Sequence, residues 1–165
     1  MGQIRHEPSL EIDRVRAATA EVRALIEELD RELAERYAPE QRHGLALNAI
    51  FEPHVRFFVA RSGGAAVGCG GIALFPDFAE VKRMYVRSEA RGRGVADAIL
   101  ARLTAEATEA GLTVLRLETG THQAAALRFY RRCGFHPREA FEPYASMRPE
   151  AVATSVFLEK RLPER

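Results

Sequence analysis

The stretch VRSEARGRGVADAIL, residues 86–100, places two glycines and three arginines between an apolar run and an alanine-rich run. The preceding run, Ala79–Arg87, alternates like a strand, and Val95–Ala110 carries apolar residues at helical spacing. A strand that turns through glycines into a helix leaves the first helical N–H groups unpaired, and the helix dipole favours an anion there. The stretch therefore predicts an anion-binding seat at Arg91–Ala96.

The segments on both sides of this seat predict a mixed sheet with helices on its faces, an α/β or α+β fold. Glycines at 111 and 134 are expected to end two of the helices. The expected elements are a strand near Gln3–His6, one long or two short helices over Ile12–Tyr37, a hairpin over Val55–Phe75, the strand Ala79–Arg87, the helix Val95–Ala110, a strand over Leu112–Glu118, the helix Gln123–Cys133 and a strand over Ala153–Leu162.

Side chains in the strand Ala79–Arg87 are expected to alternate strictly between the two faces of the sheet, because successive strand residues point in opposite directions. One face would carry Glu80, Lys82, Met84 and Val86, and the other Val81, Arg83, Tyr85 and Arg87.

Composition favours one ordinary globular domain over residues 1–165 and gives no general signal for a charged partner. The chain has 24 Lys and Arg against 23 Asp and Glu, a net charge of +1, so we expect neither a nucleic acid nor a membrane as partner. No run of about 18 apolar residues occurs, which predicts a cytoplasmic protein. The two cysteines and five histidines lack the spacing of a metal site, so no metal is expected.

Two further motifs accompany the glycine stretch and identify a family resemblance. Residues 91–96, RGRGVA, fit the pattern [Q/R]-x-x-G-x-[G/A], and QAAALRFYRRCGF at 123–135 fits N-x-x-A-x-x-[FL]-Y-x-x-x-G-F, except that Gln123 stands where asparagine is usual. Neither a Walker phosphate loop nor a G-x-G-x-x-G fingerprint is present. In order and spacing the chain resembles the GNAT superfamily of acetyl-CoA-dependent N-acetyltransferases over about Val55–Leu162.

This resemblance implies a twisted, mostly antiparallel sheet of six to seven strands whose central strands splay apart to admit acetyl-CoA. It implies an acetyl-CoA-binding core at 55–162 and a substrate-side helical region at 1–50. An N–H near Val86 would act as oxyanion donor. The residues implied in cofactor binding are Met84, Tyr85, Val86, Arg91, Gly92, Arg93, Gly94, Val95, Ala96, Gln123 and Tyr130.

Two carboxylates compete for the role of general base. Glu80 lies eleven residues before Arg91, a spacing similar to that of the catalytic glutamate in histone-acetylating family members. Its alternative is a structural ion pair with Lys82. Glu118, at the end of the next strand, is the rival base. Tyr130 matches the family tyrosine that protonates the leaving sulfur, although a tyrosine on an apolar helix face is often simply core.

The resemblance also implies an acceptor side between the N-terminal helices and the loop before the last strand, with Tyr37, His43 and Tyr144 as pocket residues or, as the alternative, as residues that only pack the loops. The acceptor would be a primary amine of a small molecule or, as an alternative, of a protein. A second hypothesis is a regulatory or interaction module that binds acetyl-CoA without turnover. A homodimer is possible by analogy.

Overall fold

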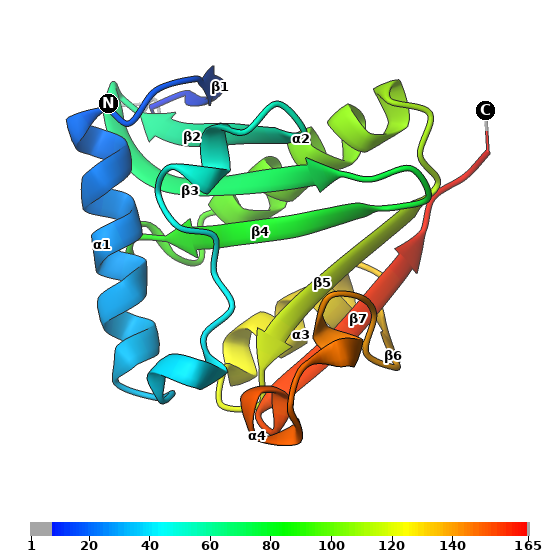
Figure 1. The fold of residues 1–165 in the computed structure, drawn as a ribbon. Coiled ribbons are helices and arrows are strands. Elements are labelled where there is room, and N and C mark those ends of the chain that lie inside the picture. Colours follow the sequence, from blue (N-terminus) through cyan, green and yellow to red (C-terminus); the bar gives the residue numbers. More distant parts are fainter. Residues whose placement is uncertain (1–7, 165) are drawn as a thin grey trace, which may run out of the picture.

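A computed structural model describes residues 8–164 and shows one seven-stranded sheet with helices on both faces (Figure 1). The strands run in the order β1-β2-β3-β4-β5-β7-β6, and every neighbouring pair is antiparallel except β4 and β5. The strands are β1 (Leu10–Val15), β2 (Val55–Ser62), β3 (Ala65–Leu74), β4 (Ala79–Val86), β5 (Val114–Gly120), β6 (His136–Arg138) and β7 (Ser155–Arg161). The α-helices are α1 (Ala20–Ala34), α2 (Val95–Glu109), α3 (Ala124–Arg132) and α4 (Pro149–Val152). The short 3₁₀ turns are η1 (Pro39–Gln41), η2 (Ala49–Phe51), η3 (Ser88–Ala90) and η4 (Tyr144–Ser146). The predicted mixed sheet is confirmed.

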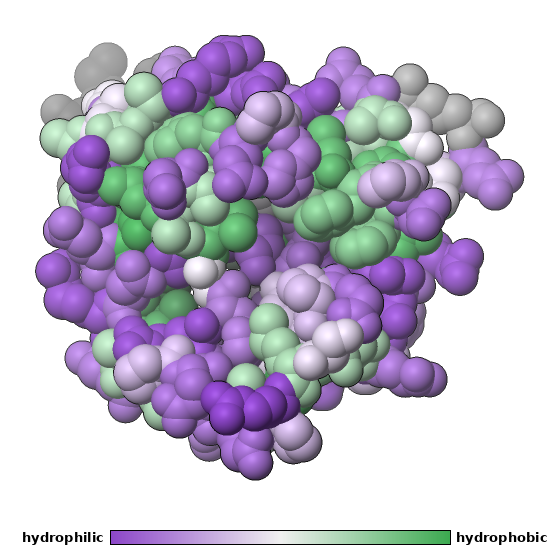
Figure 2. Space-filling model, in the orientation of Figure 1, coloured by the Kyte–Doolittle hydropathy of each residue, from purple (hydrophilic) through white to green (hydrophobic). Residues whose placement is uncertain are grey.

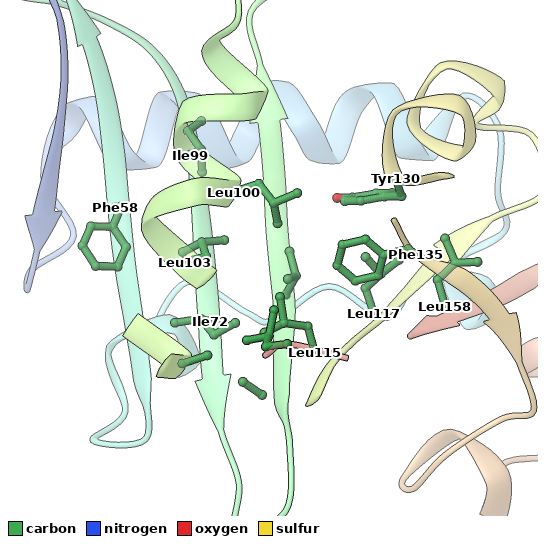
Figure 3. Packing of buried hydrophobic residues seen from close by; sticks show 14 of the residues in the cluster. Phe58, Ile72, Ile99, Leu100, Leu103, Leu115, Leu117, Tyr130, Phe135 and Leu158 are labelled. Atoms are coloured by element: carbon green, nitrogen blue, oxygen red, sulfur yellow. The ribbon is translucent and has the colours of Figure 1, made fainter. Parts of the chain in front are cut away.

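The sheet buries a separate apolar cluster on each face. On one face, α1 packs through Leu25 and Leu29 against a cluster that includes Phe57. On the other face, α2 buries Ile99 and Leu103 against the sheet in the larger cluster (Figure 3). The apolar residues of each helix recur at i, i+4, which places them on one side of the helix and explains why both can cover a sheet. The two helices thus hold β4 between them.

The N-terminal region departs from the prediction. Leu10–Val15 forms the edge strand β1 beside β2, and the helix begins only at Ala20, where the Thr19 hydroxyl accepts the N–H of Val22. The predicted helix over Ile12–Tyr37 was therefore too long at both ends. The alternating apolar residues of β1 are too few to outweigh the helical pattern that follows. The strand expected near Gln3–His6 lies outside the described residues.

The other predicted elements are found within a few residues of their expected bounds. Helix α2 follows Gly94, whose φ is +78°, and its end is followed by Gly111 at φ +79°, conformations that favour glycine. The segment between α3 and β7, predicted as a loop, contains β6, η4 and α4 in addition. β6 is a three-residue edge strand, too short to show a period in the sequence.

Strands β4 and β5 splay apart, as the resemblance implied. They pair only at Ala79 with Leu115 and at Glu80 with Arg116. Beyond that point the two strands diverge, as Figure 1 shows. The remainder of β4 thus has a sheet partner on its β3 side only.

Strand β4 also contains an irregularity that corrects the expected alternation of its side chains. The register with β3 shifts opposite Cys69–Gly71, and Arg83 has φ +56°. Val81, expected on the same face as Arg83 and Tyr85, packs instead in the cluster that contains Met84 and Val86. Arg83 bonds to Asp30 of α1, and Tyr85 packs in the cluster on the α1 face. Strict alternation across β4 was therefore wrong, because a bulge adds one residue and re-aims the side chains that follow.

Candidate active site

A groove with a volume of about 430 Å³ runs along the end of β4, the start of α2 and one side of α3. The backbone at Gly92 and Gly94 has φ of +77° and +78°, and a Cβ at either position would meet no atom within 4 Å. The glycines are thus required by the turn and leave open space beside the first N–H groups of α2. This geometry fits the predicted anion seat.

Most of the predicted cofactor residues border this groove, and two do not. Arg93 is exposed and is not among the residues that line it, and Gln123 lies at the cavity described below. The predicted residues that line the groove are Met84, Tyr85, Val86, Arg91, Gly92, Gly94, Val95, Ala96 and Tyr130.

The arginines at the groove are held by partners on the protein. Arg91 donates from Nε to the Val86 carbonyl at 2.9 Å and from Nη2 to Glu32 at 2.8 Å. Arg132 pairs with Asp97 at 3.2 Å. Because these pairs are largely exposed, each contributes little to stability, on the order of 0–1 kcal/mol, and can exchange for another anion.

A second, smaller cavity of about 110 Å³ lies between α1, the segment after it, and the splayed strands. It shares Met84, Ala126 and Tyr130 with the groove, so the two spaces adjoin at these residues. On the face that carries α1, Figure 2 shows a hollow near the centre, bordered mainly by hydrophilic residues. Of the predicted acceptor residues, Tyr37 and His43 line this cavity and Tyr144 does not.

Glu118 faces this cavity from β5. The Ser155 hydroxyl on β7 donates to its Oε2 at 2.7 Å, which fixes the carboxylate. Burial raises the pKa of Glu118 above the ordinary value of a glutamate, against the opposing effect of the Ser155 hydrogen bond. A carboxylate with a raised pKa at a cavity wall can accept a proton near neutral pH.

Glu80 occupies a different environment, in a buried polar cluster. It is 3% exposed, accepts the Tyr144 hydroxyl at 2.5 Å and lies 3.1 Å from Lys82 Nζ. Lys82 also donates to Tyr144 at 2.8 Å and to the His43 carbonyl at 3.1 Å. Burial, and then the nearby Glu80 charge, raise the pKa of the Tyr144 phenol. The ion pair with Lys82 that the sequence left open is therefore present, and Glu80 does not line the cavity.

Tyr130 is buried and borders both spaces. In Figure 3 its side chain extends from α3 toward Leu100, with the hydroxyl at the leading end, while Phe135 packs edge-on at 5.5 Å. Burial raises the pKa of its phenol well above the ordinary value, so the hydroxyl keeps its proton through the neutral range.

The turn before α3 explains the departure at Gln123. Its Oε1 accepts the Gly120 N–H at 3.1 Å and the Thr119 hydroxyl at 3.2 Å, an arrangement in which the side chain closes the turn. The Tyr37 hydroxyl accepts the His122 N–H at 3.0 Å, which joins the end of α1 to the same turn.

Two arginines of the cavity, Arg42 and Arg83, were missed by the sequence analysis. Arg83 was placed on a strand face and given no role. Its signal was its position: a charged side chain in a buried strand is rare, and this could have marked Arg83 as a candidate site residue. Arg42 stands in a loop with no pattern that could have singled it out.

Comparison with known proteins agrees with this geometry. The model of the acetyltransferase (GNAT) family matches residues 20–135, most of the chain. The chain belongs to the acetyltransferase (GNAT) family. This confirms the resemblance and the assignment to the acyltransferases.

Relatives of this GNAT chain support the same assignment. The IAA acetyltransferase of Azospirillum brasilense is 43% identical over 157 residues, which cover 94% of this chain and 99% of the relative. The crystal structure of a putative acyl-CoA N-acyltransferase from Klebsiella pneumoniae subsp. pneumoniae MGH 78578 is 37% identical, with a TM-score of 0.79 over 93% of this chain and 98% of that one. PaiA N-acetyltransferase from Thermoplasma acidophilum, solved in complex with coenzyme A, shares the fold with a TM-score of 0.70 at 16% identity, over 93% of this chain and 99% of that one.

Two further properties of this GNAT chain concern residues 8–164. Within that range no three His, Cys, Asp or Glu side chains are gathered as a metal ion would require. Over the same range, none of the helices combines the length and apolar character needed to cross a bilayer.

Proposed function

We propose that this GNAT chain transfers the acetyl group of acetyl-CoA to a primary amine of a small molecule. The observation that carries the proposal is the meeting of two unlike spaces at Tyr130 and Met84. One space borders a helix N-terminus suited to phosphate, and the other contains a carboxylate with a raised pKa. A thioester in the groove and an amine in the cavity would have their reacting ends side by side.

On the donor side, the N–H groups of Arg91–Ala96 would hold the pyrophosphate of acetyl-CoA. The part of β4 beyond Glu80, which has no β5 partner, would pair with the pantetheine arm. The Val86 N–H is proposed as the donor to the acetyl oxygen. This assignment is supported by the backbone groups of β4 that have no β5 partner, where the two strands splay apart.

For the general base, we propose Glu118 in preference to Glu80. Glu118 lines the cavity, and its pKa is raised by burial. Glu80 accepts from Tyr144 and Lys82 within the protein, and is absent from the residues that line the cavity. We therefore assign Glu80 a positioning role, since it orders Lys82 at the wall of the cavity and Tyr144 behind that wall.

In the proposed reaction, Glu118 and Tyr130 account for both proton transfers. The amine nitrogen attacks the acetyl carbon, the C–S bond breaks, and the amine gives a proton to Glu118. Tyr130 gives a proton to the departing sulfur of coenzyme A and is reprotonated afterwards from Glu118 or solvent. The products are the N-acetylated amine and the free thiol of coenzyme A.

The test is a panel of amines, with release of the coenzyme A thiol as the signal. The panel includes amino acids, aromatic amines, polyamines and a lysine-containing peptide. IAA is assayed beside the panel, because one relative carries that name. We expect thiol release with at least one small amine and its loss in Glu118→Gln. Tight acetyl-CoA binding without release by any acceptor would favour the alternative of a non-catalytic acetyl-CoA-binding module.

A further inference from the structure

The smaller cavity, the proposed acceptor site, is called the acceptor cavity from here on. It is lined by a buried arginine, Arg83, whose guanidinium has hydrogen-bond partners, in the described part of the chain, for only some of its N–H groups. The Arg83 side chain is 5% exposed, and its Nη2 donates to Asp30 at 2.8 Å. Its Nε is buried and has no hydrogen-bond partner among residues 8–164. A buried donor without a partner costs about 1–3 kcal/mol. Such a group beside a cavity indicates a ligand that supplies the missing acceptor.

The backbone around Arg83 is built to hold this side chain in place. Arg83 has φ +56°, an uncommon conformation for a residue with a Cβ, at the irregular part of β4. Gly44 packs directly on its guanidinium, so closely that a Cβ at position 44 would collide with it. Backbone strain at a cavity residue is typical of functional positions, where it is maintained by the surrounding structure.

Arg42 provides a second donor at the same cavity. It follows η1, lines the cavity with Arg83, and its Nε is likewise buried without a partner among the described residues. Within residues 8–164 it forms no ion pair. Two buried Nε donors on separate segments of one small cavity are a recognition feature for an anion.

The charges around the cavity are unequal. Arg42, Lys82 and Arg83 line it, against a single acid, Glu118. Glu80 compensates Lys82 from behind, and Asp30 compensates Arg83 from a half-exposed position on α1. This leaves Arg42 without a counter-charge among the described residues and Arg83 with free donors. An entering anion would restore the balance.

We infer that the acceptor is an amine that carries a carboxylate, as an amino acid does. The carboxylate would receive N–H bonds from Arg83 and Arg42, and the amine would face Glu118. This inference rests on the proposed function, since it names the substrate class of the same site. Arginine suits the role because its planar fork matches the two oxygens of a carboxylate.

The first test compares matched acceptors on the wild-type protein. L-Methionine, L-phenylalanine and L-glutamate are each assayed beside their α-carboxamides, by thiol release and by calorimetric titration into the protein–coenzyme A complex. Amidation removes the negative charge and lowers the pKa of the amine, which by itself would favour attack by the amide. We expect at least one amino acid to exceed its amide more than tenfold in kcat/KM and in affinity.

The second test uses Arg83→Gln and Arg42→Gln, with Arg23→Gln on the exposed side of α1 as the matched control. We expect each cavity variant to raise the KM of the preferred amino acid roughly tenfold or more, which corresponds to about 1.4 kcal/mol. The KM of its amide and the Kd of acetyl-CoA should stay within twofold, and Arg23→Gln should change neither. Arg42→Gln keeps the test valid if Arg83→Gln does not fold, because Arg42 lies in a loop.

The outcomes separate this inference from the proposed function. Turnover of uncharged amines or amides at rates equal to or above those of the amino acids would overturn the carboxylate assignment and leave the acetyltransferase proposal standing. Selective, arginine-dependent binding of amino acids without thiol release would overturn the acetyltransferase proposal and leave the carboxylate assignment standing. An unchanged ratio of amino acid to amide in both arginine variants would also overturn it.

Discussion

The groove and the acceptor cavity are built in opposite ways. The groove is bordered mainly by residues of one continuous segment, Met84–Asp97, and its proposed anion seat consists of backbone N–H groups at the start of α2. The cavity draws its walls from α1, the segment after η1, β4, β5 and α3. The chemistry proposed for it comes from side chains, chiefly Glu118, Arg83 and Arg42.

This difference has a physical consequence for how each site can change. A seat made of backbone donors depends on turn geometry, so it tolerates many side chains but few replacements of glycine. A cavity made of side chains from separate segments can change its ligand by single substitutions. The groove should therefore define what the family shares, and the cavity should define which acceptor this chain takes.

The largest effect is expected for Glu118→Gln, which leaves the cavity shape intact and removes the proposed base. We expect kcat/KM for the best acceptor to fall by about 10² to 10⁴, the usual contribution of general-base catalysis. The Kd of acetyl-CoA should not change, because the groove is untouched. Glu109→Gln, at the exposed end of α2, is the matched control. A loss below threefold in Glu118→Gln would exclude Glu118 as the base.

Next in size is Gly94→Glu, which tests the groove alone. The new side chain meets positive φ at the helix start and brings a negative charge to the anion seat. We expect the Kd of acetyl-CoA, measured by calorimetry, to rise roughly 30-fold, equivalent to about 2 kcal/mol. Gly111→Glu is a close control, because Gly111 also has φ +79° and open space but lies at the other end of α2. Equal losses of acetyl-CoA affinity in both variants would contradict an anion-binding seat at the start of α2.

A smaller effect is expected where the two spaces meet. Tyr130→Phe keeps the packing against Phe135 and removes only the hydroxyl. We expect kcat to fall roughly 10-fold, below the usual contribution of acid–base catalysis of about 10² to 10⁴, with the Kd of acetyl-CoA within twofold. A full rate with acceptors of every class would show that Tyr130 is only a core residue.

The smallest predicted effect concerns stability behind the cavity. Tyr144→Phe removes only the hydroxyl group that donates to buried Glu80, so we expect a loss of about 1–3 kcal/mol in the free energy of unfolding. Tyr37→Phe serves as comparison, because it breaks a bond to the backbone of exposed His122 and should cost less. Chemical denaturation measures both. A cost for Tyr144→Phe no greater than that for Tyr37→Phe would contradict the proposed positioning role of Glu80.

The same contrast explains what the sequence could and could not predict. The glycine turn, α2 and the tyrosine of α3 are encoded in short contiguous patterns, so their positions and the fold class were predictable. The bulge at Arg83 was not, because it arises from the pairing of β4 with β3. Nor was the burial of Glu80, which depends on Tyr144, 64 positions later in the chain. Such contacts are long-range, and no local period reports them.

The pH dependence of kcat/KM in wild type, Glu118→Gln and Glu80→Gln tests whether a base with a raised pKa in the acceptor cavity activates the amine. A raised pKa keeps Glu118 protonated to higher pH, so the wild-type rate should climb along an acidic limb whose midpoint lies above the ordinary glutamate value of about 4.3. That limb should persist in folded Glu80→Gln protein and should be absent in Glu118→Gln, where only the titration of the acceptor's own ammonium group, common to all three proteins, remains. A limb that survives in Glu118→Gln and disappears in Glu80→Gln would contradict the account and return the role of base to Glu80.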